Sequence, residues 1–139
     1  MIFEVRTTSK DQQDSKGQDL LAEIRRTMGI NSVRKIRTAR VYRLEGLSQK
    51  EALFFSKKVL FEPIDQRMTF NKKIFNSSSR VVEVAYKPGV MNPESTSLLK
   101  SATDLKLKLK AADSSWEYAF YGKVTKENLQ KIIKRLLVN

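Results

Sequence analysis

The chain has neither cysteine nor histidine among its 139 residues. The lack of cysteine excludes disulfides, thiol nucleophiles and cysteine-ligated metals. The lack of histidine removes the commonest general acid–base group and the commonest ligand of transition metals. Carboxylates could still catalyse or hold Mg²⁺, but they stand singly among basic residues, and there is no Gly-rich phosphate loop. The sequence therefore predicts no catalytic, cofactor-binding or metal-ligating residue.

Long hydrophobic runs are also missing. No apolar stretch approaches the ~18 to 20 residues that span a bilayer, and the first ten residues, MIFEVRTTSK, lack the layout of a signal peptide. Hydrophobic residues make up 40% of the chain and charged residues 30%, which is typical of a folded domain. We therefore expect one compact domain in the cytoplasm.

Acidic residues are few relative to basic ones: 15 Asp and Glu stand against 27 Lys and Arg, a formal net charge of +12. The excess is spread over both halves of the chain. It indicates either a polyanionic partner, such as nucleic acid or an acidic protein surface, or simply a well-solvated lysine-rich exterior. The sequence leaves both interpretations open.

Apolar residues at helical spacing predict four helices, which begin after Asp14-Ser15, Ser48, Pro93 and Thr125. The second begins with the capping box SQKE. Period-two alternation predicts strands in IFEVRTT, IRTARVYRL, RVVEVAY and WEYAFYG. Residues 105–110, where three lysines alternate with three leucines, could continue the preceding helix or form a strand, and we favour the strand.

The order strand, helix, strand, helix occurs twice. Residues 3–5 match 82–84, Leu20 matches Leu98, and Ser48 matches Thr125. This pattern predicts an α+β fold of two tandem β-α-β-(β)-α units, residues 1–64 and 80–139, joined by a linker at 65–79. Each unit is small, so we expect the two to form a pseudo-dimer with a shared core, antiparallel or mixed sheets and helices packed outside.

Two segments resemble a known family. YKPGVMNPES at 86–95 is similar to the motif KPGVxDPxG of PurS, the small subunit of phosphoribosylformylglycinamidine (FGAM) synthase. GINSVRKIRTAR at 29–40 is similar to the segment G-[YF]-x-x-V-x-x-V-R-x-G-K of that family.

Neither half carries the whole pattern. The first half keeps Asp14 and Gly17 but lacks the Pro-Gly turn, whereas the second keeps the turn but has Asn92 for Asp and Ser95 for Gly. This split resembles the N-terminal region of the large fused enzyme, PurL, where a PurS-like tandem imitates a PurS dimer within one chain. The resemblance thus implies a PurS-like version of the duplicated fold.

The resemblance also implies a role in de novo purine biosynthesis that is not catalytic by itself. The chain would be a scaffold that organises two partners, the ATP-dependent synthetase and the glutaminase that supplies ammonia. ATP and Mg²⁺ would belong to the synthetase, so the chain itself would hold no cofactor. Whether it is a separate subunit or an N-terminal domain stays open.

The turn between the second predicted repeat's first strand and its helix is a candidate docking element. Pro88 fixes φ and Gly89 can adopt a positive φ, so the turn is expected to be rigid and exposed. The candidate partner-docking residues are Lys87, Pro88, Gly89, Val90 and Asn92. The alternative is that the turn only reverses the chain.

Two other functions compete with the scaffold. Trp116, Tyr118 and Phe120 share one face of a predicted strand, and such a face with basic surroundings could stack nucleic-acid bases. The same three residues could equally be core, and the RNA-recognition signature is absent from the sequence. A ferredoxin-like regulatory domain that binds a small molecule is the remaining alternative, although no sequence feature marks its pocket.

Overall fold

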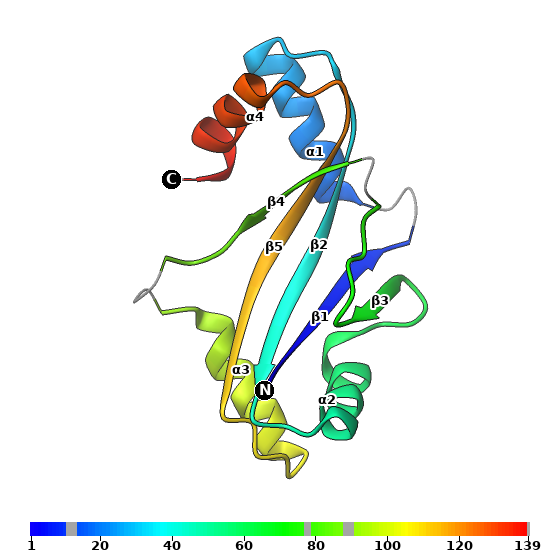
Figure 1. Ribbon diagram of the computed structural model, residues 1–139, viewed down its shortest axis with the longest axis vertical. Coiled ribbons are helices and arrows are strands. Elements are labelled where there is room, and N and C mark those ends of the chain that lie inside the picture. The colour runs from blue at the N-terminus through cyan, green and yellow to red at the C-terminus, as the bar shows by residue number, and fades with distance from the viewer. Residues whose placement is uncertain (11–13, 77–78, 88–90, 139) are drawn as a thin grey trace.

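The structure, a computed structural model, describes residues 1–10, 14–76, 79–87 and 91–138. Within these ranges the chain has an α+β fold, with a five-stranded antiparallel sheet and four helices (Figure 1). The elements are β1 (Ile2–Ser9), α1 (Ser15–Glu23), β2 (Val33–Glu45), α2 (Gln49–Phe55), β3 (Gln66–Phe70), β4 (Arg80–Val84), α3 (Pro93–Asp104), β5 (Ala111–Gly122) and α4 (Lys126–Ile132). Three helices continue into a π-helical turn: α1 into η1 (Ile24–Met28), α2 into η2 (Ser56–Leu60) and α4 into η3 (Ile133–Leu137).

The two longest strands, β2 and β5, form the centre of the sheet. They pair along almost their whole length, from Val33 opposite Gly122 to Glu45 opposite Ala111. β1 flanks β2 and β4 flanks β5, with β3 outside β1, so the strand order is β3-β1-β2-β5-β4. The strands that the sequence predicts in the two halves therefore meet at the β2–β5 pair.

The four helices of the described residues begin within one residue of the predicted starts, because their first turns are capped by side chains. Asp14, Ser48, Asn92 and Thr125 each accept a hydrogen bond from a backbone amide of the first turn. At Ser48 the capping box is complete, since the Glu51 carboxylate also accepts from the Ser48 amide at 3.0 Å. These local signals are sufficient to set the helix starts.

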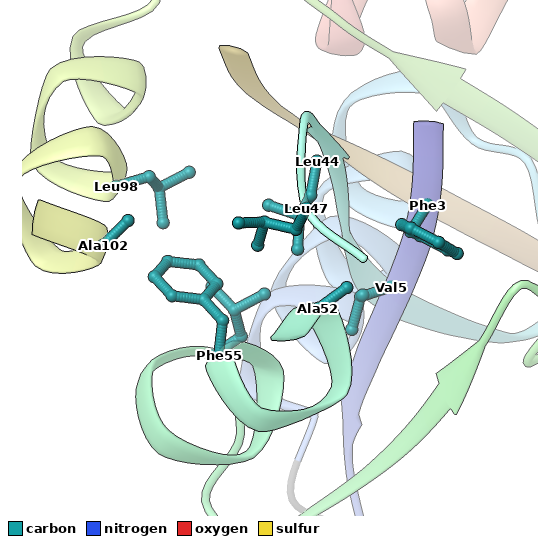
Figure 2. Packing of buried hydrophobic residues seen from close by; sticks show 9 residues of the cluster. Phe3, Val5, Leu44, Leu47, Ala52, Phe55, Leu98 and Ala102 are labelled. Carbon is teal, nitrogen blue, oxygen red and sulfur yellow. The ribbon is translucent and has the colours of Figure 1, made fainter. Parts of the chain in front are cut away.

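One core cluster lies at the end of the sheet covered by α2 and α3 (Figure 1). Phe55 of α2 is completely buried and faces Leu98 and Ala102 of α3 (Figure 2). Beneath them lie Phe3 of β1 and Leu44 of β2. This cluster therefore combines residues from both predicted halves.

The second core cluster lies at the other end of the sheet, under α1 and α4 (Figure 1). Ile24, at the end of α1, and Ile132 of α4 are both completely buried, and they pack on Ile36 of β2 and Phe120 of β5. By strand alternation, these residues lie on the same sheet face as the first cluster. The core is thus shared between the halves at both ends.

The opposite face of the sheet is covered near its centre by the segment between β3 and β4. Phe75 is 9% exposed and packs on Ala39 and Ala119, the small residues of two paired strands. Small side chains at these positions let an aromatic ring approach the sheet closely.

Two expectations about local structure need revision. Residues 105–110 are not a strand: Lys106 has a φ of 61°, and the Leu107 amide donates to the Ala102 carbonyl, as in a helix-terminating motif. The alternation of lysine and leucine nevertheless corresponds to a difference in burial, because Leu105, Leu107 and Leu109 pack against the first core cluster. In addition, the segment expected to be a linker contains β3, which the sequence did not predict.

Candidate functional site

The candidate docking segment leaves β4 and enters α3. Lys87 is exposed, as expected for a contact residue, whereas Pro88, Gly89 and Val90 lie outside the described residues. Asn92 has a different environment: it is buried and caps α3. Of the docking candidates in the described part of the segment, Lys87 is therefore accessible to a partner, whereas Asn92 is buried at the start of α3.

The side chain of Asn92 is fully engaged within the chain. Its oxygen accepts from the Glu94 amide at 3.0 Å, and its nitrogen lies 2.8 Å from Asp113 Oδ1 and 3.0 Å from the Ser114 carbonyl oxygen. These bonds tie the start of α3 to β5. Asn92 therefore positions the docking segment and has no spare group for a partner.

Two large apolar side chains flank the docking segment and were not singled out from the sequence. Tyr86 is 51% exposed and Met91 is 82% exposed. Solvent-exposed aromatic and methionine side chains are enriched at protein interfaces. Tyr86, Lys87 and Met91, named here the Tyr86–Met91 surface, are exposed side chains of this part of the chain on which a partner could bury apolar area.

Arg40 and Trp116 face each other across the centre of the β2–β5 pair. The Arg40 guanidinium carbon lies 4.6 Å from the Trp116 ring centroid, and the Lys16 ammonium lies 4.4 Å from it. Arg40 also forms an ion pair with Glu94 at the start of α3. This arrangement occupies the middle of the helical face, between the two core clusters.

A cavity lies on each side of the Arg40–Trp116 pair. The β4 cavity has a volume of about 220 Å³ and is lined by side chains that include Val84, Tyr86 and Glu94. The β1 cavity has a volume of about 180 Å³ and is lined by side chains that include Thr7 and Lys16. The β4 cavity adjoins the Tyr86–Met91 surface through Tyr86.

The opposite sheet face carries a network of ion pairs across four strands. Arg43 of β2 contacts Glu4 of β1 at 2.9 Å and Glu83 of β4 at 2.6 Å. Arg6 of β1 contacts Glu117 of β5 at 3.1 Å, and both side chains are about nine-tenths buried. The network therefore joins the strands laterally. Its Arg6–Glu117 pair is buried, and buried charges must be paired to be tolerated, whereas Arg43, Glu4 and Glu83 are each about one-third exposed.

Charge pairing lowers the pKa of two carboxyl groups of this network. The hydrogen bond from Arg43 is the main cause that holds the pKa of Glu83 below its ordinary value. Burial acts to raise the pKa of Glu4, but the hydrogen bond from Arg43 and the nearby Arg6 outweigh it, so this pKa is also lowered. Both carboxylates are thus stabilised as anions, which suits a structural network and not proton transfer near neutral pH.

The aromatic face considered for base stacking is not available on the surface. Tyr118 is 8% exposed and Phe120 is 1% exposed, both in the second core cluster, and Trp116 is partly buried under Lys16 and Arg40. Burial also raises the pKa of Tyr118. The stacking platform is therefore filled by the chain's own helices and basic side chains.

Two features, a metal-binding group of side chains and a membrane-spanning helix, are absent from the described residues. No three acidic side chains come close enough together there to hold a metal ion. None of the helices described is both long enough and apolar enough to cross a membrane.

Comparison with known proteins gives no family assignment. No protein-family model matches the chain, and no curated protein matches it.

Proposed function

We propose that this chain is a tandem of two PurS-like units that serves as a non-catalytic scaffold of FGAM synthase. It would hold the ATP-dependent synthetase and the glutaminase together, with ATP and Mg²⁺ bound by the synthetase. The proposal combines the motif resemblance with the arrangement of the two halves.

The observation that carries the proposal is the correspondence between the strand pairs of the two halves. Val5 pairs with Tyr42 on β2, and Val82 pairs with Tyr118 on β5. A central antiparallel pair would then join two β-α-β units, which supports the proposed two-fold pseudo-dimer. Such a pseudo-dimer within one chain is what the resemblance implies.

This match differs from the sequence alignment by two positions. The sequence matched Val5 with Val84, whereas the strand pairing makes Val82 its counterpart. A shift of two residues keeps the same side chains on the same sheet face, so the hydrophobic pattern alone could not distinguish the two alignments.

The helix caps support the same correspondence. Asp14 and Asn92 each cap the first helix of a half and bind a strand of the same half, through Thr38 and Ser114 respectively. Ser48 and Thr125 each cap the second helix. A duplication explains why equivalent caps recur in the same order.

The proposed contact with the synthetase is the Tyr86–Met91 surface. Asn92 fixes the start of α3 to β5, so Met91, the residue before it, adjoins an anchored position and a partner would lose less conformational entropy on binding there. Tyr86 and Met91 supply apolar area and Lys87 supplies positive charge. The equivalent end of β1 has Ser9 in place of Tyr86, which would make docking one-sided.

The proposal is tested by reconstitution. The chain would be mixed with FGAM synthetase lacking any PurS-like part and with the glutaminase, and both complex formation and FGAM synthesis would be measured. We expect a stable complex and FGAM synthesis from glutamine only when the chain is present, while synthesis from added ammonia is less dependent on it. The proposal is wrong if the synthetase and glutaminase assemble and use glutamine equally well without the chain.

A further inference from the structure

We propose that the β1 cavity binds a single tetrahedral oxyanion, as inorganic phosphate or as the phosphate group of a small metabolite. This inference does not depend on the proposed scaffold function. It rests on three donor groups whose residues line this cavity together with Trp116, and on a comparison with the β4 cavity.

Two of these donors are buried and have no partner among the described residues. Thr7 is 2% exposed, and its hydroxyl lines the cavity without a hydrogen bond. The Nε of Arg40, which also lines the cavity, is likewise buried and unpartnered. Buried polar groups almost always have a hydrogen-bond partner. Two buried groups without one at the same cavity therefore indicate a ligand that accepts a hydrogen bond from each.

The third donor is the ammonium of Lys16. It lies over the Trp116 ring and has no carboxylate partner among the described residues. Lys16 also lies at the start of α1, where the helix dipole favours negative charge. A cation placed over an indole beside two buried donors can form a charge-assisted hydrogen bond to an anion with little rearrangement.

The one acidic residue that lines this cavity does not oppose an anion. The Asp14 carboxylate accepts hydrogen bonds from the Gly17 amide, from both the amide and the hydroxyl of Thr38, and from Arg37 Nε. Its charge is paired with Arg37 at 3.2 Å, and its lone pairs are occupied. Asp14 therefore leaves no coordination capacity for a cation in the cavity.

The β4 cavity, at the corresponding place in the other half, shows that the fold does not require these polar groups. Val84 occupies the position that matches Thr7, since these residues pair with Trp116 and Arg40 respectively. Glu94, at the start of α3, occupies the place that Lys16 has in α1, and it pairs with Arg40. Both cavities share Arg40 and Trp116 and contain hydroxyl groups. They differ at two corresponding positions, where the β4 cavity has Val84 and Glu94 and the β1 cavity has Thr7 and Lys16.

The size of the β1 cavity limits the ligand. At about 180 Å³ it is smaller than the roughly 300 to 1,000 Å³ of pockets that enclose drug-sized molecules. It has room for one oxyanion with bound water but not for a whole nucleotide. Any sugar or base attached to the phosphate would therefore extend into solvent.

Trp116 provides a direct readout, because it is the only tryptophan in the chain. Its fluorescence would be titrated with inorganic phosphate at constant ionic strength, with sodium chloride as the non-tetrahedral control. The chemical shift of its indole N–H would serve as a second measurement. We expect saturable changes with phosphate and not with chloride, and absence of saturation in both measurements would overturn the proposal.

Three variants test the assignment of residues. Thr7→Val, which introduces the side chain found at position 84, and Lys16→Met should each weaken phosphate binding about tenfold. Lys50→Met removes an equally exposed lysine elsewhere and should leave the affinity unchanged. Thermal unfolding would establish that Thr7→Val is folded. Equal affinity of Thr7→Val and the unmodified chain, or an equal loss in Lys50→Met, would contradict the site.

Ribose 5-phosphate distinguishes the two sources of the oxyanion. If it binds more tightly than inorganic phosphate, the ligand is a phosphorylated metabolite whose remaining part contacts the rim. If inorganic phosphate binds more tightly, the site is for the free ion. Either order supports an oxyanion site, whereas binding of neither compound overturns it.

Discussion

Gly46 and Gly122 occupy corresponding positions at opposite ends of the β2–β5 pair. Their φ angles are nearly the same, +105° and +109°. A Cβ atom on Gly46 would lie 2.8 Å from the amide nitrogen of Lys110, and one on Gly122 would lie 2.8 Å from the amide nitrogen of Arg34. Each glycine thus allows the chain to leave one central strand while in close contact with the backbone of the other.

Replacing either of these glycines should destabilise the fold to a similar extent. Gly46→Ala and Gly122→Ala should each lower the free energy of unfolding by about 2 to 3 kcal/mol, because a positive φ strains alanine and the added methyl group meets backbone. Urea denaturation would measure the loss. Gln49→Ala, at an exposed position in α2, should change stability by no more than about 0.5 kcal/mol. A large loss at only one glycine would argue against their structural equivalence.

The two equivalent helix caps should differ in their contribution to stability. Asp14→Ala removes the carboxylate that pairs with the buried Arg37 at 3.2 Å and should cost about 3 to 5 kcal/mol. Asn92→Ala removes only neutral hydrogen bonds and should cost about 1 to 3 kcal/mol. Chemical denaturation of both variants checks the order. A greater loss at Asn92 would show that the Asp14–Arg37 pair is not the stronger anchor.

The Arg43–Glu83 pair predicts acid sensitivity. The pKa of Glu83 is lower in the folded chain than the ordinary value of 4.5, so the unfolded state takes up a proton first as the pH falls. The contribution of this pair to stability is therefore complete above about pH 4.5 and is lost as the pH falls through the folded-state pKa. Unfolding would be followed between about pH 7 and about pH 3.

A charge-removing variant isolates this effect. Arg43→Gln should make stability less dependent on pH in the acid range, because Glu4 and Glu83 lose the guanidinium that holds their pKa values down. Lys57→Gln removes an exposed positive charge from η2 and should leave the acid dependence as it is. The same pH slope in Arg43→Gln and the unmodified chain would contradict the assignment.

The first half should not fold alone. Residues 1–64 lack Leu98 and Ala102, which cover Phe55, and they lack β5, which pairs with β2. The isolated half would leave a fully buried aromatic side chain and a long strand edge exposed. We expect a disordered or aggregated fragment by circular dichroism and size-exclusion chromatography. A stable monomer with a cooperative unfolding transition would disprove the shared core.

The Tyr86–Met91 surface makes a prediction about binding. In the reconstituted complex, the double variant Tyr86→Ala/Met91→Ala should weaken affinity for the synthetase by about 2 kcal/mol or more, because the two side chains are expected to be binding hot spots of this surface. Ile64→Ala is the matched control, because Ile64 is 77% exposed and lies in the turn before β3. Both proteins should unfold at the temperature of the unmodified chain. If Ile64→Ala weakens binding equally, the docking surface has been assigned to the wrong place.

The helix starts and four of the five strands of the described chain could be predicted from the sequence because their signals are local. The Ser48–Glu51 capping box and the alternation around Val5 each involve a few neighbouring residues. β3 gave no such signal. It is a strand because the outer edge of β1 offers it hydrogen-bonding partners, and that edge exists only in the folded sheet.

The two cavities could not be predicted for a related reason. Arg40 and Trp116 are brought together by the register between β2 and β5, which depends on packing far along the chain. Among the docking candidates, sequence reasoning identified Asn92 correctly as the start of a helix but could not show that Asp113 and Ser114 would occupy its side chain. Contacts between distant segments decide which polar groups remain accessible.

The central β2–β5 pair also dictates when the molecule can fold. During synthesis β2 is complete long before β5 emerges, since Val33 finds its partner only at Gly122. Until β5 emerges, neither core cluster is complete, because each combines residues from both halves. The apolar faces of β2, α1 and α2 therefore stay partly uncovered. Contacts of such large sequence separation slow folding and prolong the exposure of apolar surface. The nascent first half is therefore the stage at which aggregation through exposed apolar surface is most favoured.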